Sequence, residues 1–287
     1  MKIRWTKGQI EQLEEQILEC LREDNPQSVR HIFYRMVNPQ LPVSVPKDDS
    51  GYRRVQNRCK VMRERGRLPY RWIADNSRTG YITTSYTGLD DFILSTAGLY
   101  RRDIWHEHGV HCEVWCESLS IASVLRALCA IWAVSLFPTR GFSSLTFLHD
   151  AAEHLDYIAQ TGAQSAHLFY VGDYDPAGRL IDEDVETKIR RYSQQDLHDW
   201  LRFERIAINE GQIRAYNLPT KPRKKSEKRK PEMLETVEAE AMQAGILRGL
   251  LADRIAALLP EGALAAAQVA EKSERLHLRK LAAIDRN

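Results

Sequence analysis

Apolar positions at helical spacing predict three helices in the first part of the chain. In the first of them the apolar side chains recur every three or four residues, at Ile10, Leu13, Ile17 and Leu21. Ser28 and Ser50 are expected to cap the second and third helices. The three expected helices cover residues 7–22, 29–37 and about 50–65. Residues 69–75 follow with strand character, and three helices before a short strand or hairpin favour a winged-helix (CAP-like) domain.

From residue 111 onward, short apolar runs alternate with amphipathic stretches. The expected strands cover residues 111–116, 134–137, 166–172 and 203–208. The expected helices between them cover residues 118–131, 144–159 and 178–192. Alternation of strand and helix implies a parallel sheet with helices on its faces, so this part is expected to be a Rossmann-like α/β domain.

The last part of the chain has a different pattern. Residues 217–231 hold three prolines and a run of bases, which predicts an exposed linker or loop. Residues 233–259 and 263–283 are rich in Ala and Leu and are expected to be helical. The length of 287 residues indicates two domains, or one domain with appendages. The expected divisions are residues 1–105, 106–216, 217–231 and 232–287.

The composition is that of a soluble globular protein, with 43% hydrophobic and 28% charged residues. The longest apolar run, near residues 127–137, is too short to span a bilayer, and the N-terminus lacks the apolar region of a signal peptide. Five cysteines at irregular spacing do not predict a disulfide framework. We therefore expect a cytoplasmic protein with reduced thiols and no membrane partner. Zinc binding at His111, Cys112 and Cys116 is disfavoured, because the spacing matches no zinc knuckle and the two cysteines fall on one apolar face of a strand.

Basic residues gather where the third helix is expected. Residues 50–80 contain nine Arg and Lys but two acids, while the whole chain carries a net charge of only +2. Such clustering favours a surface that binds the phosphates of double-stranded DNA. The expected contacts are Arg53, Arg54, Arg58, Lys60 and Arg63. The alternative is a solvated helix face without a ligand.

Three carboxylates are expected at the carboxyl ends of two strands. Glu117 follows the first strand of the α/β region, and Asp173 and Asp175 follow the third. Functional residues gather at this edge of open α/β sheets. Converging carboxylates raise each other's pKa, and a divalent cation relieves that repulsion. Oxygen ligands suit Mg²⁺, with Mn²⁺ as a substitute. Alternatively, Asp175 caps the helix that begins at Gly178.

A glutamate after a strand, followed later by Asp173-Tyr-Asp-Pro-Ala-Gly178, resembles the Toprim domain of topoisomerases, primases and certain nucleases. The stretch from Gly172 to Ile181 is most similar to the A subunit of topoisomerase VI and its meiotic double-strand-break relatives. In that family a lysine follows the glutamate, where this chain has Ser118, and a histidine stands at Ala177. The resemblance implies a winged-helix domain followed by a Toprim domain that binds Mg²⁺. The segment of residues 236–241 is also similar to bacterial and phage proteins of this type.

The same resemblance implies a candidate nucleophile. Arg30-His-Ile-Phe-Tyr34 is similar to the family segment whose second tyrosine attacks the DNA backbone, so Tyr34 and Arg30 join Glu117 as candidate catalytic residues. A phenol has a pKa near 10, and nearby cations such as Arg30 and Arg35 are expected to favour its ionised form. The alternative is that Tyr34 is a core aromatic residue.

Three functions are compatible with these residues. The first is topoisomerase VI A-like DNA cleavage by a homodimer, in which Tyr34 of one protomer meets the carboxylates of the other and forms a 5′-phosphotyrosyl link. Strand passage would then require a separate ATPase partner. The second is a metal-dependent Toprim nuclease in which activated water attacks and Tyr34 is structural. The third is a DNA-binding protein without catalytic activity.

Overall fold

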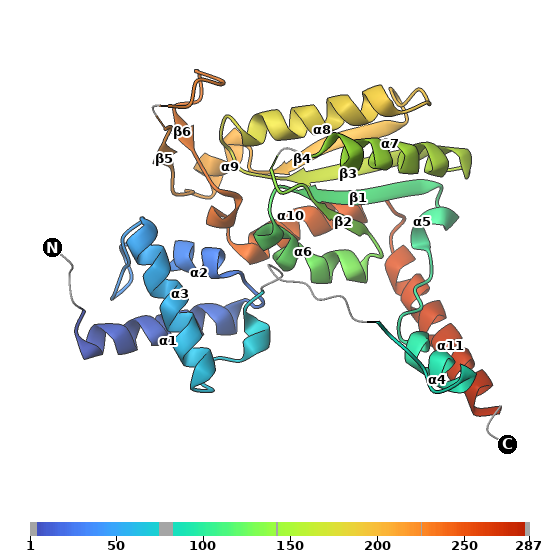
Figure 1. Cartoon of the computed structure of the whole chain (residues 1–287), viewed down its shortest axis with the longest axis horizontal. Coiled ribbons are helices and arrows are strands. Elements are labelled where there is room, and N and C mark those ends of the chain that lie inside the picture. Colours follow the sequence, from blue (N-terminus) through green and yellow to red (C-terminus); the bar gives the residue numbers. More distant parts are fainter. Residues whose placement is uncertain (1–4, 75–82, 142, 225, 285–287) are drawn as a thin grey trace.

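The N-terminal helices form where they are expected and pack around a core of their own. The computed structural model describes residues 5–74, 83–141, 143–224 and 226–284. The first helices are α1 (Lys7–Glu23), α2 (Val29–Met36) and α3 (Asp49–Glu64), which lie together at one end of the molecule (Figure 1). Their shared core is built from buried side chains at helical spacing, among them Leu13, Ile17, Ile32 and Val55.

Two local expectations in this region are wrong. Asp48 rather than Ser50 caps α3, because its carboxylate accepts the Gly51 N–H at 2.9 Å and the helix then begins two residues earlier than Ser50 would set it. In place of the strand expected over residues 69–75 there is a 3₁₀ turn, η1 (Tyr70–Trp72). The strand character is reduced to one bridge between Gln27 and Ile73, since Pro69 cannot donate to a ladder. Asp75 lies outside the described residues, and those described here form no hairpin.

A parallel sheet forms the centre of the α/β region, as expected. Its strands are β1 (Val110–Cys116), β2 (Ser135–Pro138), β3 (Ser165–Val171) and β4 (Leu201–Ala207), in the order β2-β1-β3-β4. The chain leaves β1 toward β2 on one side and returns to β3 on the other. At such a reversal of strand order the loops diverge and leave a crevice at the carboxyl ends of the strands. Here those are the ends of β1 and β3.

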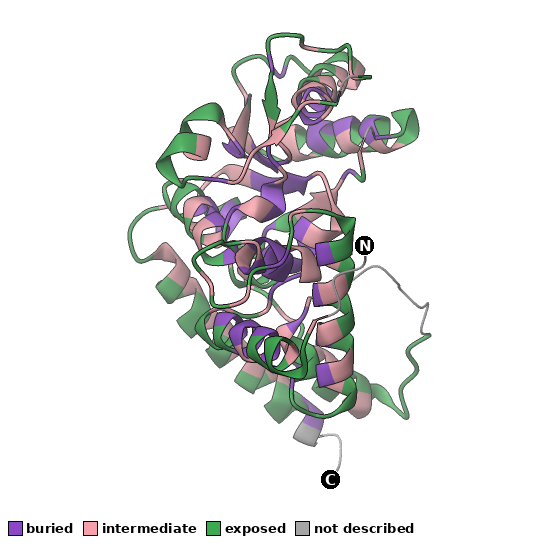
Figure 2. Cartoon of the chain, turned by 90° about the vertical axis from the view of Figure 1, so that its left-hand side faces the viewer, coloured by how far each residue is buried: buried purple, intermediate pink, exposed green. Residues whose placement is uncertain are grey.

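Helices cover both faces of the sheet. The helices α6 (Leu119–Ile131) and α10 (Ala244–Ala256) pack on one face with Cys112, Val114 and Cys116. The helices α7 (Leu145–Gln160) and α8 (Gly178–Tyr192) pack on the other face with Trp115. Figure 2 shows buried residues concentrated in the strands and on the inner sides of these helices. The region also contains two short helices, α5 (Ile104–Glu107), which contacts β1, and α9 (Glu210–Ala215).

The segment before α10 is not helical, contrary to expectation. It contains the short strand β6 (Glu235–Thr236), which pairs with β5 (Lys221–Pro222) so that the expected linker folds back as a loop, and the 3₁₀ turn η2 (Ala239–Ala241). Val237 exchanges two backbone hydrogen bonds of 2.8 Å with Tyr174. These N–H and C=O groups bond to the sheet region, so they cannot form a helix.

The last helix, α11 (Ala263–Ile284), packs against α4 (Leu89–Ala97), which had been assigned to the N-terminal domain. The pair projects from the rest of the molecule (Figure 1). Polar contacts continue beside it, where Glu274 accepts from Tyr100 at 2.9 Å and from Arg102 at 2.8 Å. Among the described helices there is none long and apolar enough to cross a membrane.

Candidate active site

Glu117 lies in the crevice at the end of β1, where two glycines make room for it. Its Oε2 accepts the N–H of Asp173 at 2.9 Å, which joins the ends of β1 and β3. A Cβ atom at Gly172 would lie 2.9 Å from this oxygen, and one at Gly178 would lie 3.1 Å from it and 2.4 Å from the carbonyl oxygen of Asp173. Position 178 therefore requires glycine because a Cβ there would clash with the Asp173 backbone. At position 172 the Tyr170 ring, 2.6 Å away, and the Glu117 carboxylate would have to shift.

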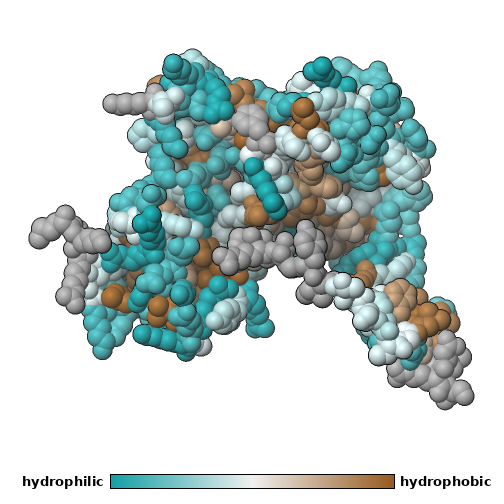
Figure 3. All heavy atoms as spheres, in the orientation of Figure 1, coloured by the Kyte–Doolittle hydropathy of each residue, from teal (hydrophilic) through white to brown (hydrophobic). Residues whose placement is uncertain are grey.

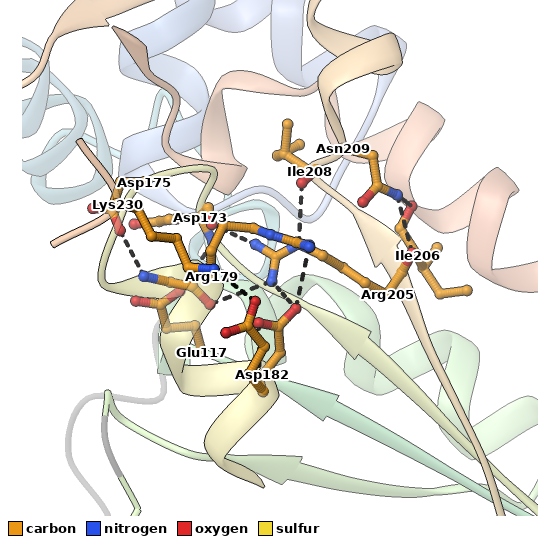
Figure 4. Close-up of polar contacts among 12 residues, drawn as sticks. Glu117, Asp173, Asp175, Arg179, Asp182, Arg205, Ile206, Ile208, Asn209 and Lys230 are labelled. Carbon is orange, nitrogen blue, oxygen red and sulfur yellow. Dashed lines mark hydrogen bonds and ion pairs between the residues drawn. The ribbon is translucent and has the colours of Figure 1, made fainter. Parts of the chain in front are cut away.

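Asp173 is held by contacts from three directions. Its Oδ1 accepts the N–H of Ala239 at 2.8 Å. Its backbone carbonyl accepts from the guanidinium of Arg205, which also forms a 2.6 Å ion pair with Asp182. Figure 4 shows Arg205 extended between these two acceptors, with a further bond of 3.1 Å to the carbonyl of Ile208. The Arg205 and Asp182 side chains are each only 6% exposed, so this pair stabilises the turn rather than neutralising the Asp173 carboxylate.

Asp175 has the structural role that was considered as its alternative. Its Oδ1 accepts the N–H of Gly178 at 2.6 Å and so caps the start of α8. A carboxylate has a second oxygen, which remains free to bind another group while the first one caps the helix. Capping and cation binding are therefore compatible at this residue.

Burial and mutual repulsion raise the pKa of carboxylates in this crevice. Burial is the main cause for Glu117 and for Asp173, whose pKa values both lie above their usual range. Repulsion contributes as well, from Asp175 and Glu240 on Glu117, and from Glu117, Glu240 and Asp175 on Asp173. Glu240 is itself buried, with its pKa raised by that burial. Its position makes it a fourth carboxylate of the cluster.

The donor set fits a hard divalent cation. The side chains here offer only oxygen ligands. The raised pKa values of Glu117 and Asp173 reflect the cost of holding negative charges close together and away from solvent, a cost that a bound cation would reduce. The ligand atoms of Glu117, Asp173 and Asp175 do not all lie within 4.8 Å of one another. The groups of described residues that meet this distance lie elsewhere. An open arrangement of this kind suits Mg²⁺, which keeps several waters and takes one or two carboxylates directly.

Residues 238–240 are functional candidates that sequence reasoning missed. Glu238 and Glu240 lie on either side of Ala239, whose N–H holds Asp173. Glu240 faces the cluster, while Glu238 forms an ion pair with Arg30 and a second one of 2.8 Å with Lys221. The similarity of residues 236–241 to related proteins was the signal available, but the segment follows Asp173 by more than sixty positions and no local pattern assigns it a partner.

The segment of residues 238–240 also lies beside Tyr34. The Tyr34 phenol lies beside the Glu238 carboxylate, and its ring centroid lies 5.8 Å from both the Lys47 and the Lys221 ammonium nitrogens. The side chain is only 8% exposed. Burial and the Glu238 charge raise the pKa of this phenol despite the opposing effect of Arg30. Arg30 favours the phenolate, as expected, but burial and Glu238 outweigh it in this arrangement.

A cleft connects Tyr34 with the acidic segment. It has a volume of about 560 Å³ and lies between α2 and the start of α10. Tyr34, Asn38, Tyr216 and Glu240 are among the residues that line it. One chain therefore brings the candidate nucleophile and one of the four carboxylates to the same cleft.

The five expected DNA contacts have different environments. Arg58 lies 3.5 Å from the Glu14 carboxylate, which is 3% exposed and also pairs with Arg67 at 2.5 Å. Arg54 stacks over Trp5, and Arg63 stacks over Tyr70. Arg53 and Lys60 are exposed on the outer side of α3, so they are the members of the set best placed to meet phosphates.

Replacing Arg53 and Lys60 together with alanine is expected to weaken DNA binding without changing stability. If each side chain contacts one phosphate, the slope of log affinity against log salt concentration becomes shallower by roughly 2, because about 0.9 of a counterion is released per contact. Fluorescence anisotropy with a labelled duplex at several salt concentrations measures this. Arg191→Ala with Arg202→Ala removes two exposed bases elsewhere and serves as the control. An unchanged slope in the α3 variant would rule out this surface.

No protein-family model, curated protein or solved structure matches this chain. Parallel α/β sheets carry many unrelated activities, so the fold does not select a function. The chemistry has to be argued from the residues at the carboxyl ends of β1 and β3.

Proposed function

We propose that this protein cleaves phosphodiester bonds of double-stranded DNA in a Mg²⁺-dependent reaction. The observation that carries the proposal is the cluster of Glu240, which is buried, with the partly buried Glu117, Asp173 and Asp175 at the point where the strand order reverses. A cation bound there would neutralise phosphate charge and stabilise charge on the departing oxygen, with Mn²⁺ as a substitute for Mg²⁺. The resemblance of the Asp173–Gly178 turn to Toprim domains supports the same chemistry.

In the topoisomerase VI A-like form of the proposal, Tyr34 is the nucleophile. Its oxygen bonds to phosphorus, the bond between phosphorus and the 3′ oxygen breaks, and the departing oxygen takes a proton from solvent. The phenolic proton passes to Glu238. Burial acts to raise the pKa of Glu238, but Lys221 and Arg30 outweigh it and hold that pKa low, so the carboxylate is ionised and able to accept. The product has DNA joined to Tyr34 through a 5′ phosphate.

A second candidate is a Toprim nuclease in which water attacks phosphorus. The burial of Tyr34 and its raised pKa favour this form, because a buried neutral phenol is a poor nucleophile until the cleft opens. Tyr34 would then stabilise the contact between α2 and Glu238. A non-catalytic DNA-binding protein is the third possibility, and the retained carboxylates argue against it.

The proposal includes a homodimer and, for strand passage, a separate ATPase partner. Exposed apolar side chains on the projecting α4–α11 pair support self-association, among them Leu89, Phe92, Leu276 and Leu281. Figure 3 shows apolar surface gathered at this tip. Contact between Tyr34 of one protomer and the carboxylates of the other stays a prediction.

Incubation with supercoiled plasmid tests the shared chemistry. We expect linear or nicked DNA in the presence of Mg²⁺ or Mn²⁺ and none after addition of EDTA, read on agarose gels. Treating half of each sample with proteinase before electrophoresis separates protein-linked DNA from free ends. Cleavage that persists at full rate in EDTA would contradict the proposal.

A further inference from the structure

A second cluster of potential ligands lies on β1, far from the carboxylates of the crevice. His111 and Glu113 are two residues apart and therefore lie on the same face of the strand, and His154 of α7 covers that face. The imidazole Nε2 of His111 lies 3.0 Å from Oε1 of Glu113, and Nε2 of His154 lies 3.7 Å from the same oxygen. The ligand atoms of all three side chains lie within 4.8 Å of one another.

The carboxylate of this cluster is buried and oriented. Glu113 is only 2% exposed, and its second oxygen accepts the indole N–H of Trp115 at 2.8 Å. This bond turns Oε1 toward the two imidazoles. A buried carboxylate is costly unless a positive group compensates it. His154, at 47% exposed, leaves a path from solvent to the cluster.

We propose that His111, Glu113 and His154 form a binding site for Zn²⁺. Zinc takes imidazole nitrogen and carboxylate oxygen at about 2.0–2.2 Å in tetrahedral geometry, so neighbouring ligand atoms should lie roughly 3.3–3.5 Å apart. The observed separations of 3.0 and 3.7 Å bracket that spacing. Three protein ligands leave one position for water. The Trp115 N–H supplies the outer contact that fixes a ligating carboxylate.

The cysteines that neighbour His111 in sequence take no part in this site. Cys112 and Cys116 lie on the opposite face of β1, in the core beneath α6. Burial raises the pKa of both thiols, which disfavours the thiolate that zinc needs. A hydrogen bond between His111 and Glu113 alone is the simpler interpretation, but it does not explain why His154 approaches the same oxygen.

The site is distinct from the crevice. Glu113 and Glu117 lie on the same side of the chain but four residues apart, roughly 13 Å along an extended strand. The proposed zinc would join α7 to β1 and stabilise the sheet, and it does not depend on the proposed cleavage activity. An exposed group on α7, His149, Asp150 and Glu153, lacks a buried ligand and supplies the control.

Cobalt and zinc titrations of the full-length protein test this site. With Mg²⁺ in excess to occupy the crevice, Co²⁺ is expected to bind one to one and give the visible absorption of a nitrogen-ligated ion, which Zn²⁺ then removes. His154→Ala should weaken binding at least about tenfold and abolish the rise in melting temperature that Zn²⁺ gives. His149→Ala should match the wild type in both measurements.

His154 is half exposed, so its replacement should leave the metal-free melting temperature unchanged and any loss of binding can be assigned to the ligand. His154→Gln provides a second variant of similar size. The proposal is overturned if the wild type shows no stoichiometric binding, or if His154→Ala binds like the wild type. It is equally overturned if His149→Ala, and not His154→Ala, loses the metal.

Discussion

Asp173→Asn is expected to abolish Mg²⁺-dependent DNA cleavage and to raise the melting temperature of the metal-free protein. Asparagine keeps an oxygen that can accept the Ala239 N–H but removes the charge that Glu117, Glu240 and burial oppose. Loss of Lewis-acid stabilisation worth several kcal/mol corresponds to at least about a 100-fold fall in rate. The gain in stability is about 1.4 kcal/mol for each unit by which the folded-state pKa exceeds the unfolded one.

The pH dependence of that gain has a definite sign. The folded-state pKa of Asp173 is raised, so ionisation costs stability as the pH rises above the unfolded value, and the cost is complete above the folded value. The difference in stability between Asp173→Asn and the wild type should therefore be largest above the folded-state pKa and shrink as the pH falls from there to the unfolded-state pKa. Thermal melts across that range, in a chelator, measure it.

Asp184→Asn is the matched control for this variant. Asp184 lies on α8 and pairs with Lys188 at 2.8 Å, away from the crevice. Its replacement should leave cleavage intact and give no gain in melting temperature. If Asp173→Asn still cleaves DNA at the wild-type rate, the carboxylate cluster is not the catalytic centre.

Tyr34→Phe is expected to eliminate protein-linked DNA and to reduce cleavage at least about 100-fold, since only the hydroxyl can bond to phosphorus. Phenylalanine keeps the ring in the core of α2 and leaves Glu238 paired with Arg30 and Lys221. The plasmid assay with and without proteinase measures both effects. Cleavage at the wild-type rate, with products insensitive to proteinase, would instead assign the attack to water.

Tyr52→Phe serves as the control for the tyrosine variant. Tyr52 is a half-buried neighbour whose ring packs edge-on against Phe33 at 5.6 Å. Removing its hydroxyl should change neither cleavage nor the covalent product. A loss of activity in both variants would point to packing of the N-terminal core rather than to the chemistry of Tyr34.

Local patterns predicted what depends on local structure. The helices α1 to α3 and α6 to α8 and the four strands follow from apolar spacing, whereas α4, α5 and α9 are not predicted by it. The strand ends placed Glu117 and Asp173 beside each other because parallel strands share their carboxyl edge. The sequence could not show that Glu14 is buried near Arg58, since that contact joins α1 to α3. Nor could it place Ala239 on Asp173, a contact made by chain folding over sixty-six positions.

The three residues from Glu238 to Glu240 have a thermodynamic consequence. They touch Tyr34 on one side and Asp173 on the other, so α2 and the crevice share one short piece of backbone. If a ligand at one end of this backbone changes the affinity for a ligand at the other end, the second ligand changes the affinity for the first by the same factor. DNA on the N-terminal helices and a cation among the carboxylates are therefore expected to be reciprocal effectors, each tightening or loosening the hold on the other.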